Sequence, residues 1–354
     1  MEQRVQLVFD SASFRSCHAS TVVHLDSEQS CLVAWFGGHK EGDDGVVIWG
    51  TERRPDGGFS EPRVFASVGP QPHWNPVLFK PDPSKALVWL FFKYGRVIAD
   101  WITYVCFSND DGRTWTVPKE LLPGEDGRGG RGPVKNKMLL TSSGAWLAGS
   151  SDERQQWRAY IDRSSDGGIS WEATPYIAAP AGTGVIQPSL WESRPGMIHM
   201  LLRSDCGYVC RADSEDDGRT WSKLYPISLP NNNSGLDVAR LADGRLLLAY
   251  NPTSGDWAGR SPLRLSLSTD NGSTWALSVD VATGTGEFSY PAVVALADGG
   301  AVVTFTWKRN RIAYIRLERE QLEEGSDLFV PSSSLPESKG TELHSLEYFV
   351  NRVG

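Results

Sequence analysis

The sequence predicts an all-β protein built as a β-propeller, and three observations support this fold class. First, four similar octapeptides recur: SNDDGRTW (108–115), SSDGGISW (164–171), SEDDGRTW (214–221) and STDNGSTW (268–275). They start 56, 50 and 54 residues apart, a spacing typical of one repeat per propeller blade. Second, the segments between them, such as GAVVTFTWKR (300–309), alternate apolar and polar residues as strands do. Third, 36 glycines and 21 prolines suit many short strands joined by tight turns.

Each octapeptide is predicted to form a tight turn from which a new strand leaves. Its aspartate is expected to accept hydrogen bonds from backbone N–H groups two residues on, and the glycine two positions after the aspartate to supply a positive φ. Its tryptophan is expected to bury a large ring between neighbouring sheets. These residue types are those of turns, so the pattern favours a structural role over four calcium or sugar sites. The aspartates are Asp110, Asp166, Asp216 and Asp270.

A degenerate copy, TERRPDGGFSEP (51–62), keeps Asp56 and Gly58 and indicates a first blade. The segments after Trp275 supply a last blade that ends near Leu317. The count favours six four-stranded antiparallel sheets, with five or seven blades as alternatives. We expect one propeller domain over residues 1–320, in which a strand around 3–9 completes the last sheet and leaves no free edge. Residues 321–354 are expected to pack on the propeller or close it.

Composition excludes several classes of function. A net charge of −8 argues against a nucleic-acid partner, and the stretch GEDGRGGRGPVKNK (124–137) is interpreted as a loop. The five cysteines are odd in number and lack metal-ligand spacing, which predicts buried free thiols and no metal site. No apolar run is long enough to cross a membrane, and the charged start MEQRVQLVFD does not resemble a signal peptide. We expect a cytoplasmic protein, or a secreted one if a leader has been removed; the oligomeric state is left open.

The octapeptide resembles the Asp box of the sialidase (neuraminidase) superfamily, and residues 10–317 resemble its six-bladed BNR-repeat members. The segment MLLRSD (200–205) is similar to the family's second-arginine strand and points to Arg203. The run YNPTSGDWAGRSPLRLSLSTDNGSTW (250–275) is similar to the stretch with the third arginine and points to Arg260. The segment GEFSYPAV (286–293) resembles the one that holds the nucleophilic tyrosine and points to Tyr290.

Other positions depart from the family pattern. His18 stands where the first arginine of the carboxylate-binding triad belongs. Gln187 best fits the place of the glutamate that deprotonates the tyrosine, with Glu192 as a possible substitute. The segment HKEGDDG (39–45) offers three counterparts of the acid/base aspartate, and spacing does not choose among them: Glu41, Asp43 and Asp44.

The resemblance implies an exo-glycosidase that hydrolyses the bond of a terminal carboxylated sugar, with an oligosaccharide or small glycoside as its partner and no cofactor. Tyr290 would act as nucleophile or charge stabiliser and His18 as its proton partner, because tyrosine is a poor nucleophile without a base. Two alternatives remain open. One is β-elimination of a uronate with His18 and Tyr290 as base and acid. The other is a glycan-binding propeller without catalysis.

Two further segments, QPHWNPVLF (71–79) and GPVKNKMLL (132–140), place polar residues just before strands. From their positions we predict that Lys137 adds positive charge at the site and that Asn75 and His73 contact the sugar. The segment NNNSGLD (231–237) presents Asn233 or Asp237 as weaker candidates. Three tryptophans are candidates for stacking on a sugar face: Trp74, Trp101 and Trp257.

Overall fold

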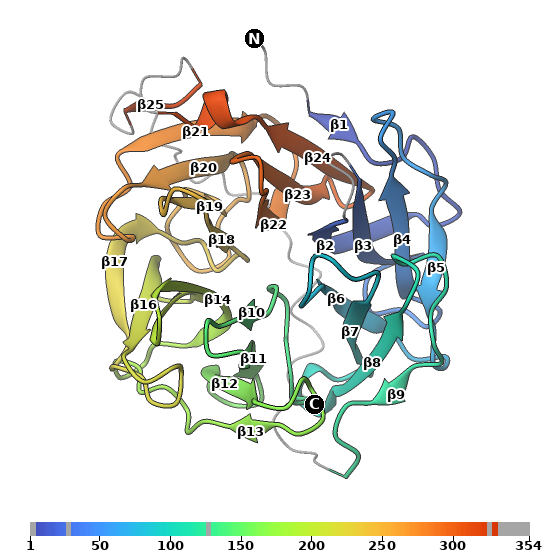
Figure 1. The fold of residues 1–354 in the computed structure, drawn as a ribbon, viewed down its shortest axis with the longest axis horizontal. Helices are drawn as coiled ribbons and strands as arrows, with labels where there is room; N and C mark the ends of the chain where they lie inside the picture. Colours follow the sequence, from blue (N-terminus) through green and yellow to red (C-terminus); the bar gives the residue numbers. More distant parts are fainter. Residues whose placement is uncertain (1–4, 26–29, 125–128, 324–327, 332–354) are drawn as a thin grey trace.

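The chain forms a ring of six antiparallel sheets around a central axis, as the computed structural model shows (Figure 1). The structure describes residues 5–25, 30–124, 129–323 and 328–331. Each sheet is one blade. In blades 1 to 5 the strand that comes first along the chain lies nearest the axis. This confirms the predicted all-β class and the predicted six blades.

Blades 1 to 3 follow one another along the chain. Blade 1 contains β2 (Ser16–His24), β3 (Cys31–Gly38), β4 (Val47–Arg53) and β5 (Arg63–Ala66). Blade 2 contains β6 (His73–Phe79), β7 (Val88–Tyr94), β8 (Ile102–Ser108) and β9 (Lys119–Glu120), with a short 3-10 helix, η1 (Ile98–Asp100), between β7 and β8. Blade 3 contains β10 (Leu139–Leu140), β11 (Trp146–Asp152), β12 (Arg158–Ser164) and β13 (Glu172–Ala173).

Blades 4 to 6 complete the ring. Blade 4 contains β14 (Val185–Arg194), β15 (Met197–Ser204), β16 (Tyr208–Ser214) and β17 (Tyr225–Pro230). Blade 5 contains β18 (Asp237–Arg240), β19 (Leu246–Tyr250), β20 (Leu263–Ser268), β21 (Leu277–Ala282) and β25 (Val330–Pro331). Blade 6 contains β22 (Phe288–Ala295), β23 (Ala301–Trp307), β24 (Arg311–Leu317) and β1 (Gln6–Leu7).

The N-terminal strand closes the ring, as predicted. β1 pairs antiparallel with β24, with Gln6 opposite Tyr314 and Leu7 opposite Ala313, so it supplies the outermost strand of blade 6. The C-terminal segment contributes a short 3-10 helix, η2 (Arg319–Leu322), and β25, which adds a fifth strand to blade 5. The rest of the predicted tail, residues 332–354, lies outside the described residues.

The four octapeptides form the turns between the third and fourth strands of blades 2 to 5. In the first, Asp110 Oδ1 accepts from the Thr114 N–H at 2.8 Å, and the Gly112 N–H donates to Ser108 Oγ at 2.8 Å. The predicted hydrogen bond from the glycine N–H to the aspartate two residues earlier was wrong in these four octapeptides. The glycine N–H instead donates to the serine hydroxyl, and the aspartate accepts from the N–H four residues after it. The degenerate copy keeps the predicted bond, from the Gly58 N–H to Asp56 Oδ1.

Large apolar side chains fill the spaces between the blades; Trp35, Phe91, Trp191 and Phe305 are almost fully buried. All five cysteines are free thiols. Four are buried as predicted, whereas Cys206 is exposed, because it lies in the turn between β15 and β16. Within the described parts of the chain, no helix has the length and apolar character needed to cross a membrane.

Candidate active site

The innermost strands of four blades carry a bulge, and a non-glycine residue there adopts a positive φ. These residues are Ala19 (56°) in β2, Asn75 (41°) in β6, Gln187 (56°) in β14 and Tyr290 (52°) in β22. The pairing register shifts at each of them. Bulges re-aim side chains and are frequent beside active sites. The inner strands of four blades therefore share the same local device.

Tyr290 lies at the centre of the site. Arg203 Nη1 donates to its Oη at 2.6 Å, and Gln187 Nε2 lies 3.5 Å from the same oxygen. The His18 and Tyr290 ring centroids are 4.1 Å apart, and the Arg260 guanidinium carbon lies 5.4 Å from the Tyr290 ring centre. We call these five residues the Tyr290 cluster. The cluster is thus formed by side chains of blades 1, 4 and 6 and of the loop between β19 and β20. The structure brings together the three residues to which the matching motifs pointed: Arg203, Arg260 and Tyr290.

Two arginines hold a carboxylate beside this cluster. Glu287 Oε1 accepts from Arg260 Nη1 at 2.9 Å, and its Oε2 accepts from Arg309 Nε at 2.8 Å. Burial alone would raise the pKa of Glu287, but Arg309 and Arg260 hold it well below its usual range. Arg309 also forms an ion pair with Glu41. The sequence analysis missed both Glu287 and Arg309, although Glu287 belongs to the segment that identified Tyr290.

The three acid candidates of segment 39–45 lie in different surroundings. Glu41 is joined to Arg260 of the Tyr290 cluster by a chain of ion pairs that runs through Arg309 and Glu287. Asp43 pairs with His39 at 3.2 Å and Asp44 with Arg96 at 2.6 Å, both on the exposed surface. Geometry therefore singles out Glu41 among the three. Glu192, the alternative to Gln187, lies near the opposite end of β14 from Gln187. Its carboxylate accepts hydrogen bonds from the Ser142 N–H and hydroxyl.

The remaining candidates make structural contacts. His73 uses both ring nitrogens on backbone, with Nδ1 2.7 Å from Val46 O and Nε2 accepting from the Val68 N–H at 3.0 Å. Lys137 Nζ donates to both carboxylate oxygens of Asp237 at 2.9 Å. Neither makes a hydrogen bond, ion pair or ring contact with Tyr290 among the described residues. Asn75 is buried at its bulge, and its side chain makes no hydrogen bond within the described residues.

His18 is neutral in this setting. Its side chain is buried, and burial first, then Arg309, lowers its pKa well below the usual value. Its Nδ1 lies 2.8 Å from Thr306 Oγ1, while Nε2 makes no hydrogen bond within the described residues. A neutral imidazole with one nitrogen held by a hydroxyl keeps the other available for proton transfer.

Several cations lie around Tyr290. Arg203 and Arg260 lie against its ring and Lys135 Nζ lies 5.8 Å from the ring centre, while Arg260 and Arg309 pair with Glu287 and Glu41. Lys135 donates to Asn136 Oδ1 at 2.8 Å and to two backbone carbonyls, and burial lowers its pKa to about 7. Arg203 donates to Asn233 and Tyr290 and forms no ion pair within the described residues, so its charge suits an anionic ligand. In the described part of the chain, no group of three or more His, Cys, Asp or Glu residues is placed to hold a metal ion.

A six-bladed propeller with Asp-box turns and arginines around a tyrosine on its inner strands defines the class of protein: a sialidase-like BNR propeller. The family model described as a BNR repeat-like domain matches residues 29–303. The chain belongs to this family.

Solved structures support the fold. A protein of unknown function from Dyadobacter fermentans is 16% identical, with a TM-score of 0.72, and the match covers 90% of this chain and 98% of that one. A Hadza microbial sialidase is 17% identical, with a TM-score of 0.71, covering 86% of this chain and 66% of that one. The NanB sialidase of Streptococcus pneumoniae is 16% identical, with a TM-score of 0.69, covering 88% and 70%. No curated protein matches the sequence.

Proposed function

We propose that the protein is a carbohydrate-active enzyme that hydrolyses the glycosidic bond of a terminal sugar bearing a carboxylate. The observation that carries the proposal is the convergence of Arg203, Arg260 and His18 on Tyr290. The similar folds of the two sialidases are consistent with it.

In this proposal the substrate carboxylate binds to Arg203 and Arg260. Both are guanidinium groups, which bind carboxylates through two parallel hydrogen bonds. Arg260 already pairs with Glu287, so a substrate carboxylate would share it with that side chain. The sugar carbon that gains positive charge as the bond breaks would then lie over Tyr290.

Tyr290 would stabilise that charge or attack the carbon directly. The Arg203 N–H donated to its oxygen stabilises negative charge there. His18 is the available proton acceptor, since no carboxylate contacts Tyr290 among the described residues. Glu41, tied to the site by Arg309, is the candidate that protonates the leaving oxygen, directly or through water.

A second candidate is β-elimination of a uronate, favoured by the neutral imidazole of His18 in contact with Tyr290. His18 would take the C5 proton, the C4–O bond would break as the C4–C5 double bond forms, and the Tyr290 proton would pass to the leaving oxygen. The arginines would neutralise the carboxylate and make the C5 proton more acidic.

The test is incubation of the purified protein with a panel of sialosides and uronate oligosaccharides, with two readouts. Release of saturated sugar without new ultraviolet absorbance is the result expected for hydrolysis. New absorbance from an unsaturated uronate would show that the reaction is elimination and would refute hydrolysis. Binding of a panel member without either product would refute both reactions and leave a glycan-binding propeller.

A further inference from the structure

Two cysteine thiols lie close together at the turn between β15 and β16, shortly after Arg203 in the chain. Cys206 is exposed in the turn, whereas Cys210 is buried in β16, and their sulfur atoms are 3.9 Å apart. A thiol that solvent reaches thus lies beside a second thiol that solvent does not reach. The other three cysteines are buried in the sheets of blades 1 and 2: Cys17, Cys31 and Cys106.

Burial gives the two thiols different reactivity. Burial first, and then the neighbouring Cys206 sulfur, raise the pKa of Cys210 to about 12. Burial likewise raises the pKa of Cys31 and that of Cys106 to about 12. Oxidants attack the thiolate form of an accessible cysteine, so these buried thiols react slowly with an oxidant in solution. Cys206 is therefore the thiol that such an oxidant meets first.

The distance between the two sulfurs allows a disulfide after a small movement. A disulfide bond is about 2 Å long, so the sulfurs have to approach by about 2 Å. A peroxide oxidises the Cys206 thiol to a sulfenic acid and is itself reduced to water. The Cys210 sulfur then attacks the Cys206 sulfur, the S–O bond breaks, and the hydroxyl leaves as water with the Cys210 proton. Two electrons pass from the thiol pair to the peroxide.

The turn that holds Cys206 also supports the segment that orients Arg203. The Ser204 N–H donates to Asn231 Oδ1 at 3.2 Å, and the Asn231 N–H donates to Gly207 O at 2.9 Å. Asn231 Oδ1 also accepts from the Asn233 N–H at 3.1 Å. Asn233 Oδ1 in turn accepts from Arg203 Nε at 2.7 Å. A chain of hydrogen bonds therefore connects the cysteine turn to Arg203.

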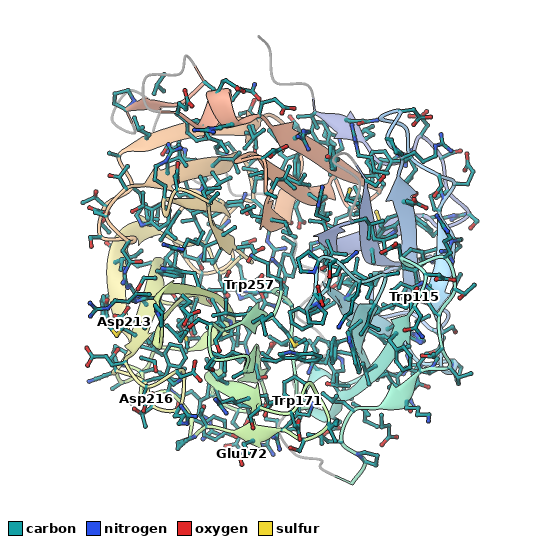
Figure 2. All side chains as sticks on the ribbon, viewed as in Figure 1. Trp115, Trp171, Glu172, Asp213, Asp216 and Trp257 are labelled. Carbon is teal, nitrogen blue, oxygen red and sulfur yellow. The ribbon has the colours of Figure 1, made fainter. Side chains whose placement is uncertain are left out.

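The same turn contacts the loop between β19 and β20. Ser254 Oγ in this loop donates to Gly207 O at 2.9 Å. The loop also carries Arg260 of the Tyr290 cluster and Trp257, which Figure 2 shows near the central axis. A displacement of the turn that follows Cys206 thus acts on the supports of both arginines in the cluster.

We propose that Cys206 and Cys210 form a redox-sensitive site: a peroxide oxidises the two thiols to a disulfide, and the displaced turn loosens the hydrogen bonds that hold Arg203. The modification is reversible, because a dithiol reductant restores both thiols. The inference goes beyond the proposed function and does not depend on it, since it concerns only the thiols and the anchor of Arg203.

The first experiment tests whether the disulfide forms. The reduced full-length protein is treated with hydrogen peroxide, denatured, alkylated with iodoacetamide and digested with trypsin. Cleavage after Arg203 and Arg211 releases residues 204–211, which contain both cysteines of the pair. We expect this peptide to be unlabelled and lighter by two hydrogen atoms, and dithiothreitol before alkylation to restore two labels. Two labels without dithiothreitol, or a disulfide between two molecules, would overturn the proposal.

Variants separate the roles of the two thiols. Cys210→Ala should stop the reaction at the sulfenic acid of Cys206, which dimedone traps, and Cys206→Ala should leave Cys210 unoxidised. Cys106→Ala is the matched control, because it removes another buried thiol, in β8 of blade 2, and it should form the disulfide as the wild type does. A dimedone adduct that accumulates in the wild type would show that Cys210 does not reach Cys206 and would overturn the proposal.

The second experiment measures the link to Arg203 by hydrogen exchange and mass spectrometry, without any substrate. In the disulfide form the amides of residues 231–233 should exchange about three- to tenfold faster than in the reduced form, the scale of one lost hydrogen bond. Peroxide-treated Cys210→Ala, which lacks the disulfide, should exchange as the reduced protein does. Unchanged exchange in the fully oxidised protein would overturn the link to Arg203 and leave the redox site standing.

Discussion

Replacement of Glu287 by glutamine should destabilise the fold in a pH-dependent way. Glu287 accepts charge-assisted bonds from Arg260 at 2.9 Å and from Arg309 at 2.8 Å. An amide keeps one acceptor oxygen but turns an NH₂ group toward the other guanidinium. One charge-assisted bond, about 1.5–3 kcal/mol, is lost. Full loss of a buried pair costs about 3–5 kcal/mol, but the side chains of Glu287 and Arg309 are 24% and 30% exposed. We expect a loss of about 2–3 kcal/mol at neutral pH.

The sign of the pH dependence follows from the lowered pKa of Glu287. A carboxyl whose folded pKa lies below its unfolded value of about 4.3 stabilises the fold above that value, and the contribution disappears as pH falls through the folded pKa. Glutamine does not titrate. The stability gap between wild type and Glu287→Gln should therefore be constant from neutral pH down to about 5 and should narrow below about 4.

Urea denaturation at a series of pH values measures this gap. Asp44→Asn is the matched control, since the Asp44–Arg96 pair is 2.6 Å long but both side chains are more than half exposed. It should change the unfolding free energy by no more than about 0.5 kcal/mol. Equal stability of Glu287→Gln and wild type at neutral pH, or a gap that does not narrow in acid, would refute the reasoning.

Three other changes test the site and its frame. Arg203→Lys should lower kcat/KM for a carboxylated glycoside at least about tenfold. A lysine has one nitrogen in place of the separate Nε and Nη1 that donate to Asn233 and Tyr290, and it cannot bind a carboxylate through two parallel N–H groups. Steady-state kinetics with an unchanged melting temperature would bear this out, and unaltered kinetics would contradict it. Lys137→Met should lower the free energy of unfolding by about 2–4 kcal/mol in urea denaturation, because it removes the lysine that pairs with the buried Asp237 carboxylate. A loss under about 0.5 kcal/mol would argue against a buried pair. Gly235→Ala should slow turnover several-fold with little loss of stability, because the new Cβ would lie 3.3 Å from the Tyr290 ring. Normal turnover of this variant would show that the ring has room to move.

The blades were predictable because the turn chemistry repeats. Asp-x-Gly turns with a following tryptophan mark the junction of the third and fourth strands in blades 2 to 5. Blade 6 has no such box because its fourth strand, β1, comes from the other end of the chain and needs no turn. Four clear octapeptides in blades 2 to 5, one degenerate copy in blade 1 and a last blade that needs no octapeptide thus account for the predicted six blades.

The site was only partly predictable, because its motifs specify single residues and not their partners. Arg203, Arg260 and Tyr290 were found from short segments, and the structure brings them together with His18. Glu287 and Arg309 carry no motif of their own. Arg309 pairs with Glu287 and with Glu41, which is 268 positions away from it in the chain, so this arrangement depends on closure of the ring.

Lys137 and His73 show a second limit of sequence reasoning. Both precede or begin strands at the axis, which suggested the site, but position along a strand does not give the direction of a side chain. The bulge at Asn75 shifts the register of β6 within two residues of His73. A shift of one residue turns a side chain to the other face of the sheet. His73, which precedes the shift, bonds to backbone of blade 1 and of the connection into blade 2.

The candidate site lies on the seam where the ring closes, and this placement links the geometry of the site to the integrity of the fold. His18 comes from the first blade and Tyr290 from the last, and Thr306 of the last blade bonds both His18 Nδ1 and the Ala19 N–H. The Cys17 N–H donates to Arg309 O at 2.8 Å across the same seam. A propeller's first and last blades are held together only after the whole chain has folded. Because His18 and Tyr290 lie on opposite sides of that seam, the Tyr290 cluster is assembled only in the closed ring.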